Sequence, residues 1–206
     1  MRRVALRPMA AALTALLAAA SATLAAAAAS AAPAANFSLG ASAGVDQGRV
    51  DCVASFPCER RSADLKLFVG YALNEAVELR ALYFNAGRFK GGGTTPAGTA
   101  PAGLQFGGGF KVSGIGITAG YRWDIVPLWS VAAQAGLASV TTRFEHANPV
   151  WRSVSQTTVQ PLVGVGLAYA VTPALRLGID FDASRFKVHT TRGPLHMLGL
   201  SAQFSF

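Results

Sequence analysis

The stretch that most constrains the fold is residues 195–206, at the carboxyl end of the chain. Every second residue from 198 to 206 is apolar, and the residues between them are Gly, Ser, Gln and Ser. Alternation with a period of two over about ten residues is typical of a strand with one face in hydrocarbon and the other in a polar lumen. We therefore expect a strand that needs an apolar environment on one side and ends on the aromatic Phe206.

The amino end has the features of an export signal. Arg2, Arg3 and Arg7 precede an uncharged, alanine-rich run over residues 9–29, and small residues then dominate positions 30–35. This order of charged, apolar and small segments is typical of a secretory signal peptide. We expect cleavage after Ala34, so that residues 1–34 are removed and residues 35–206 form the mature domain. A transmembrane anchor is the alternative, because the run is long enough to span a bilayer.

Composition narrows the class of the mature chain. It is rich in glycine, and no window after the signal holds 18 uncharged apolar residues, so a helical membrane protein is excluded. The whole chain carries 18 Lys and Arg against 10 Asp and Glu, a net charge of +8. A secreted, apolar chain without helical periodicity is either a soluble β-sandwich or a membrane β-barrel.

Alternation and turn residues predict the positions of the strands. Short turns at 73–75, 124–127 and 171–173 alternate with long loops at 46–62, 88–108, 143–156 and 187–194. Short turns at one end and long loops at the other are typical of an eight-stranded antiparallel up-and-down transmembrane β-barrel, an all-β fold with its turns in the periplasm. The predicted strands lie at about 36–45, 63–72, 76–87, 109–122, 129–142, 157–170, 174–186 and 195–206.

The fourth strand departs from simple alternation. Val112 and Ile115 are three residues apart, so both cannot face the same side of a regular strand. We therefore expect a β-bulge near Gly114.

A short motif precedes each of the three short turns. It reads Gly-Tyr-Ala-Leu-Asn at 70–74, Gly-Tyr-Arg-Trp-Asp at 120–124 and Ala-Tyr-Ala-Val-Thr at 168–172. Tyrosine and tryptophan favour the membrane–water interface. The sequence therefore predicts a periplasmic aromatic girdle of Tyr71, Tyr121, Trp123, Trp129 and Tyr169.

The whole mature length resembles the outer membrane protein A-like family of eight-stranded β-barrels. The resemblance is carried by residues 37–44, by the turn at 70–74 with Val-Glu-Leu-Arg at 77–80 after it, and by the final Phe206. It implies an integral protein of the Gram-negative cell outer membrane, exported through the general secretory pathway, with Phe206 as the signal for the outer-membrane assembly machinery. We expect the barrel alone, without the peptidoglycan-binding domain of longer members.

Charged residues of both signs keep to the inward phase of the predicted strands. They are Lys66, Glu78, Arg80, Arg122, Arg176, Asp180 and Asp182. Counting from the short turns places Glu78, Arg122 and Arg176 at one height, and Lys66 with Asp180 one layer above. Side chains just fill an eight-stranded barrel, so we expect a hydrogen-bonded plug. A gated path for small ions through the same residues is the alternative.

The two cysteines, Cys52 and Cys58, both lie in the first long loop. An exported location is oxidising, so a disulfide between them is expected. No histidine or further cysteine lies nearby, so we expect no metal site.

The long loops and outer strand ends carry an excess of basic residues, against a few acids such as Asp46. Arginine matches the geometry of phosphate oxygens, which suggests contact with lipopolysaccharide or an external partner. The alternative is a solvated fringe that keeps the loops soluble, and the location excludes nucleic acid. The candidate contacts are Arg88, Lys90, Arg143, Arg152, Arg185, Lys187 and Arg192.

No constellation of residues predicts catalysis. Similarity to the lipid A deacylase barrels would require a His-x-Ser pair, and none of His146, His189 and His196 is part of one. We therefore expect a monomeric, non-catalytic protein without a cofactor, in a structural or surface-interaction role. A narrow channel for small solutes is the alternative function.

Overall fold

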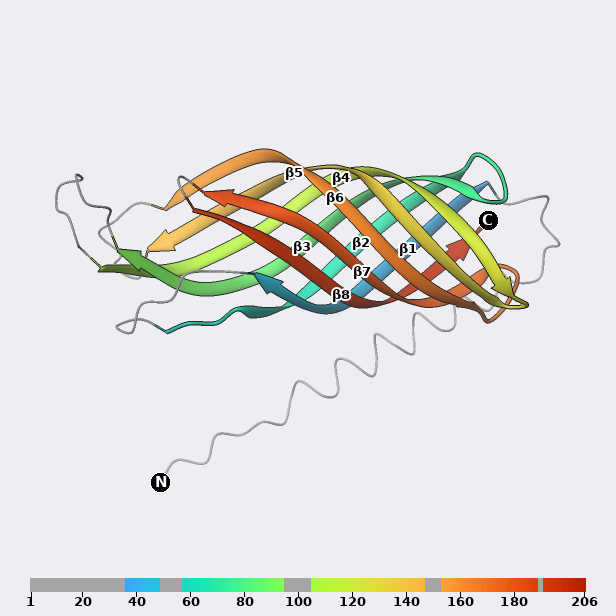
Figure 1. Ribbon diagram of the computed structural model, residues 1–206, viewed down its shortest axis with the longest axis horizontal. Helices are drawn as coiled ribbons and strands as arrows, with labels where there is room; N and C mark the ends of the chain where they lie inside the picture. Colours follow the sequence, from blue (N-terminus) through green and yellow to red (C-terminus); the bar gives the residue numbers. More distant parts are fainter. Residues whose placement is uncertain (1–35, 49–56, 95–104, 147–152, 189–190) are drawn as a thin grey trace, which may run out of the picture. The chain divides into compact units, whose positions relative to one another are not determined.

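The described residues form one closed barrel. The computed structural model describes residues 36–48, 57–94, 105–146, 153–188 and 191–206. Neighbouring strands pair antiparallel all the way round, and β1 pairs with β8 to close the barrel (Figure 1). The predicted eight-stranded antiparallel barrel is thereby confirmed. The strands are β1 (Phe37–Gly48), β2 (Arg61–Ala72), β3 (Val77–Thr94), β4 (Gln105–Val126), β5 (Trp129–His146), β6 (Val154–Ala170), β7 (Leu175–Val188) and β8 (Thr191–Ser205).

Within these ranges, no helix is long and apolar enough to cross a membrane.

The strands run further than predicted toward the end that carries the long loops. β3 and β4 remain paired as far as Thr94 and Gln105, inside the predicted loop 88–108. Glycines such as Gly91 and Gly108 face each other there. The glycine-rich composition of this segment had indicated a loop. A β-ladder needs only backbone N–H and C=O groups, so glycine-rich segments can continue it without any side-chain signal.

The outer wall of the barrel is apolar. Ile115, Ile117 and Leu200 each expose more than 60 % of their surface, and they belong to a wide set of exposed apolar side chains on all eight strands. A soluble monomer rarely exposes a contiguous apolar surface of this extent. An outward apolar band with a side-chain-filled interior is the arrangement expected of a membrane barrel.

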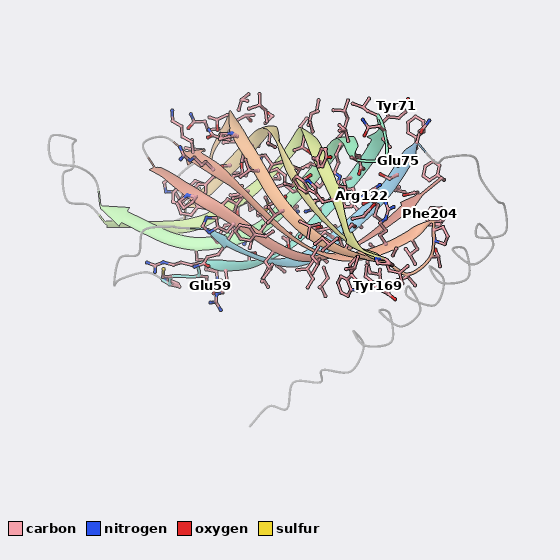
Figure 2. All side chains as sticks on the ribbon, turned by 45° about the vertical axis from the view of Figure 1, so that its right-hand side comes forward. Glu59, Tyr71, Glu75, Arg122, Tyr169 and Phe204 are labelled. Atoms are coloured by element: carbon pink, nitrogen blue, oxygen red, sulfur yellow. The ribbon has the colours of Figure 1, made fainter. Side chains whose placement is uncertain are left out.

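Aromatic pairs gather at the end of the barrel that carries the short turns. The ring centroids of Phe37 and Tyr71 lie 5.0 Å apart, those of Tyr121 and Trp123 4.6 Å, and those of Trp129 and Tyr169 5.1 Å. Figure 2 shows Tyr71 and Tyr169 toward the end that carries Glu75, away from Glu59. The five residues of the predicted girdle thus lie at one end of the barrel.

The expected bulge near Gly114 is wrong. The β3–β4 register shifts between Asn85 and Arg88 of β3, opposite Val112, whereas the β4–β5 ladder continues through this region without a shift. Val112 is buried inside the barrel, in phase with Gly114. The prediction assumed that an apolar residue of β4 must face lipid, but Val112 fills the lumen.

The bulge on β3 depends on Gly87. Its φ is 70°, a conformation that costs a residue with a Cβ about 1–2 kcal/mol. A Cβ on Gly87 would also lie 2.1 Å from Oγ of Ser62 and 2.5 Å from the carbonyl oxygen of Ala63. We therefore expect Gly87→Ala to lower the free energy of unfolding by at least about 1–2 kcal/mol, measured by urea unfolding in lipid vesicles.

The control for this prediction is Gly109→Ala on β4. A Cβ on Gly109 would meet nothing closer than 3.4 Å, and that neighbour is the flexible side chain of Arg88. Equal unfolding midpoints for the two variants would show that Gly87 does not fix the bulge.

Candidate functional site

The polar part of the lumen centres on Lys66 of β2. Its ammonium group hydrogen-bonds Oδ2 of Asp182 and lies 3.5 Å from Oδ2 of Asp180, both on β7. Gln134 of β5 donates a second hydrogen bond to Asp182, of 2.7 Å. Lys66 and Asp182 are almost completely buried. A single cation on β2 thus meets two carboxylates of β7 across the inside of the barrel, and these two strands do not pair with each other.

A second network lies nearer the short turns and centres on Glu78. Its carboxylate accepts hydrogen bonds from Oγ of Ser38 at 2.8 Å and from Nη2 of Arg80 at 3.4 Å, with Gln203 contributing a third at 3.4 Å. The guanidinium of Arg80 also lies 4.3 Å from the ring centroid of Phe68. These contacts join β1, β2, β3 and β8 through the lumen.

Glu78, Arg122 and Arg176, which were expected at one height, line one cavity at the turn end, but they do not form ion pairs with each other. The ion-pair partner of Glu78 is Arg80, which lies two residues away on the same strand face. Counting residues from a turn gives the height of a residue along its own strand. Because the strands are tilted, residues at the same height on different strands can lie far apart around the barrel. Arg122 and Arg176 line this cavity together with Glu78 and Arg80.

Lys66, Asp180, Asp182 and Gln134 form what is here called the polar layer. Two further buried carboxyl groups belong to it and were not predicted there. Asp46 was expected in the first long loop, but β1 continues to Gly48 and leaves Asp46 only 1 % exposed. Asp64 lies on the same face of β2 as Lys66, and this alternation was the signal that could have revealed it. Both oxygens of Asp46 and Oδ1 of Asp64 are buried without a hydrogen bond.

In the part of the chain that the structure describes, no group of three or more His, Cys, Asp or Glu residues is arranged to hold a metal ion.

The remaining lumen is filled with apolar side chains, a feature the sequence did not predict. The rings of Phe110 and Phe144 pack with centroids 4.6 Å apart, near the long-loop ends of β4 and β5. The interior of an eight-stranded barrel is just wide enough to be filled by side chains, and apolar side chains can fill it without needing hydrogen-bond partners. This apolar core comprises Phe68, Leu82, Phe84, Ala86, Phe89, Phe110, Val112, Ala138, Val140, Phe144, Leu162, Phe186, Leu195 and Met197.

Three cations form a row on the outer wall near the long-loop end. In the strand register Arg88 of β3 faces Lys111 of β4, which in turn faces Arg143 of β5. Glu145 accepts hydrogen bonds from Arg88 at 3.0 Å and from Lys111 at 2.8 Å. Lys111 was not among the predicted contacts, because its segment was interpreted as strand interior.

The other predicted surface contacts are spread more widely. Lys90 pairs with Glu59 at 2.9 Å, and both side chains are about half exposed. Arg185 and Lys187 lie near the long-loop end of β7, away from that row. Arg152 and the side chain of Arg192 lie outside the described residues.

Several further predictions also involve undescribed residues. Residues 1–34 and Cys52 lie outside the described ranges, so the signal peptide and the disulfide with Cys58 stay predictions. Phe206 is described: it exchanges two backbone hydrogen bonds with Phe37, of 2.9 and 3.3 Å.

The sequence and the barrel of this chain are similar to those of known outer membrane proteins. A family model described as "Outer membrane protein beta-barrel domain" matches residues 12–206. Among solved structures, Neisserial surface protein A is similar with 18% identity and a TM-score of 0.61, over 85% of this chain and 100% of that one.

Two further structures share the fold. A major outer membrane protein from Thermus thermophilus is similar with 13% identity and a TM-score of 0.55, over 84% of this chain and 100% of that one. The outer membrane protein OprG from Pseudomonas aeruginosa is similar with 9% identity and a TM-score of 0.51, over 83% and 96%. No curated protein matches the chain. At these identities the neighbours show the fold alone.

Proposed function

We propose a function from the premise that this chain belongs to the outer membrane protein β-barrel domain family. Membership implies the outer membrane of a Gram-negative cell. Within that membrane we assign the protein a non-catalytic, surface-interaction role, in which its basic outer rim contacts the phosphates of lipopolysaccharide.

The observation that carries this proposal is the row of Arg88, Lys111 and Arg143. Residues that face each other on neighbouring strands have Cβ atoms about 5 Å apart, and like charges at such positions repel one another. Glu145 neutralises only one of them. The row continues the lipid-facing wall at the end where long loops are expected outside the cell. Phosphates of an outer-leaflet lipid at this level would complete the charge balance.

The proposal extends to the predictions that fall outside the described residues. Residues 1–34 act as a cleaved signal peptide, and Phe206 takes part in recognition by the assembly machinery. The disulfide of Cys52 and Cys58 stiffens the first loop, and the assembled protein is a monomer. Arg152, Arg185, Lys187 and Arg192 belong to the same basic rim.

We expect Lys111→Gln/Arg143→Gln to weaken lipopolysaccharide binding about tenfold, because each exposed charged contact contributes up to about 1 kcal/mol. The substitutions leave the Arg88–Glu145 pair in place as a neutral unit. Binding is measured on protein in phospholipid nanodiscs by surface plasmon resonance, and raised salt should weaken it.

Two controls separate the row from a general charge effect. Arg122→Gln/Arg176→Gln removes the same charge at the opposite end of the barrel and should leave binding unchanged. Dephosphorylated lipopolysaccharide should bind the parent protein and Lys111→Gln/Arg143→Gln equally. A loss of binding that is equal for both double variants would contradict a contact at this row.

A further inference from the structure

The short-turn end of the barrel opens into a cavity, here called the mouth cavity. It is lined by Glu78, Arg80, Arg122, Gln134, Arg176 and Gln203, among others, and has a volume of about 80 Å³. This volume is below the usual range of small-molecule pockets, so the cavity can hold only a small ligand. Figure 2 shows Arg122 beside Glu75 at this end of the barrel. The expected orientation makes it accessible from the periplasm.

The carboxylates deep in the mouth cavity are already engaged. Glu78 binds Ser38 and Arg80, and Asp180 lies 3.5 Å from the ammonium group of Lys66. Across the described strands, neither carboxylate forms an ion pair with Arg122 or Arg176. These two arginines are therefore not neutralised by the inner polar layer.

Arg122 is only partly satisfied. One Nη2–H group donates to the backbone carbonyl of Glu75. Its Nε is a buried donor without a hydrogen bond, and the nearest carboxylate oxygen, Oδ1 of Asp124, lies 3.6 Å away. Asp124 is 75% exposed, so water screens most of its charge.

Arg176 has less support still. Among the described residues its side chain makes no hydrogen bond and no ion pair, although it is partly buried at the foot of β7. The charged groups that act on it are Arg122, which repels it, and Asp124 and Glu78, which attract it. Arg122 and Arg176 come from β4 and β7, which do not pair, so two guanidinium groups face one cavity from different sides.

We propose that the mouth cavity binds a phosphate group between Arg122 and Arg176. The planar guanidinium fork matches two phosphate oxygens, so two such groups can hold one phosphate from both sides. The bound anion would give the unsatisfied Nε of Arg122 an acceptor and would cancel the repulsion between the two cations. Gln134 and Gln203 also line the cavity, but their amide groups already donate to Asp182 and Glu78, so the two arginines are the principal donors for an anion.

The test uses the protein purified in detergent from outer membranes, in phosphate-free buffer with chloride holding the ionic strength constant. Inorganic phosphate is titrated in by isothermal calorimetry. We expect saturable binding of one phosphate per barrel, with about a tenfold loss of affinity for Arg176→Gln and no measurable binding for Arg122→Gln/Arg176→Gln.

A matched variant and a stability measurement locate the site. Arg60→Gln/Arg61→Gln removes two exposed cations at the long-loop end of β2 and should bind phosphate as the parent does. Because Arg176 has no structural partner among the described residues, Arg176→Gln should melt no lower than the parent without phosphate. Added phosphate should raise the melting temperature of the parent but not that of Arg176→Gln.

Two outcomes would overturn the proposal. One is unchanged phosphate affinity in Arg176→Gln. This single variant is sufficient for the test even if Arg122→Gln/Arg176→Gln does not fold. The other is a loss of phosphate binding in Arg60→Gln/Arg61→Gln, which would move the site to the long-loop end. Titration with glycerol 3-phosphate distinguishes the source: tighter binding than inorganic phosphate assigns the cavity to an organic ester, and equal binding to the free ion.

Discussion

Replacing Lys66 by Met should lower the free energy of unfolding of the barrel by about 3–5 kcal/mol, or prevent folding altogether. The ammonium group of Lys66 is the cation that hydrogen-bonds Asp182 and lies 3.5 Å from Asp180. Its removal leaves both carboxylates facing each other without a positive charge between them. Breaking one side of a buried ion pair is far more costly than replacing the whole pair.

The burial of the Lys66–Asp182 pair makes the expected loss of stability large. The side chain of Asp182 is 2 % exposed, so water cannot replace the lost ammonium group. Gln134 would remain as its hydrogen-bond donor, but an amide carries no net charge. Asp46 and Asp64 lie in the same layer, and several of their oxygens already lack a hydrogen bond.

Urea unfolding in lipid vesicles measures this effect, and a double-mutant cycle with Asp182→Asn assigns it to the pair. The combined variant should be less destabilised than the sum of the two single variants, because neither charge is then left alone. Lys90→Met is the matched control: its partner Glu59 is half exposed, so we expect a loss of at most about 1 kcal/mol. An equally small loss for Lys66→Met would mean that water fills this part of the lumen.

The sequence was sufficient for the strand order and for the side of the barrel on which Lys66 lies. Strict alternation from Asp64 to Gly70 defines the inward face of β2, and counting from the turns gives Lys66 the same height as Asp180. It could not identify Asp182 as the hydrogen-bonded partner. That contact depends on the tilt of β7 and on how far the lysine side chain reaches across the lumen.

Strand ends were the part of the fold that the sequence defined least. Asp46 follows the apolar Val45 and precedes a segment rich in polar residues, so the first strand was expected to end before it. In the barrel the neighbouring strands β2 and β8 both extend past this point, and their backbone groups pair with β1 as far as Gly48. Pairing with neighbours therefore overrides a local loop composition.

The apolar core was missed for a different reason. Alternation specifies that Leu82 and Phe84 share a face, but it does not specify which face when Tyr83 between them is also largely apolar. A rule that places every large apolar residue against lipid would fail for Phe84, which is fully buried. The narrow lumen requires bulky side chains once glycines such as Gly114 leave space opposite them.

Phe84→Ala should lower the free energy of unfolding by about 3–5 kcal/mol, because Phe84 is fully buried and its removal leaves a cavity. A Cβ at Gly114 would lie 2.6 Å from the Phe84 ring, which shows how closely the ring packs against β4. Tyr83→Ala is the matched control. Tyr83 faces outward, so lipid can fill the space that it vacates, and its cost in urea unfolding should be well below that of Phe84→Ala.

The same variant tests whether the lumen conducts. Phe84 lies opposite Lys66 in the β2–β3 ladder, at the height of the polar layer. Removing this one ring leaves other bulky side chains of the lumen, such as Phe110 and Phe144, in place nearer the long loops. Planar-bilayer recordings should therefore show no stable unit currents for the parent protein or for Phe84→Ala. Large, stable currents from the parent would contradict a closed lumen and would favour the narrow channel as its function.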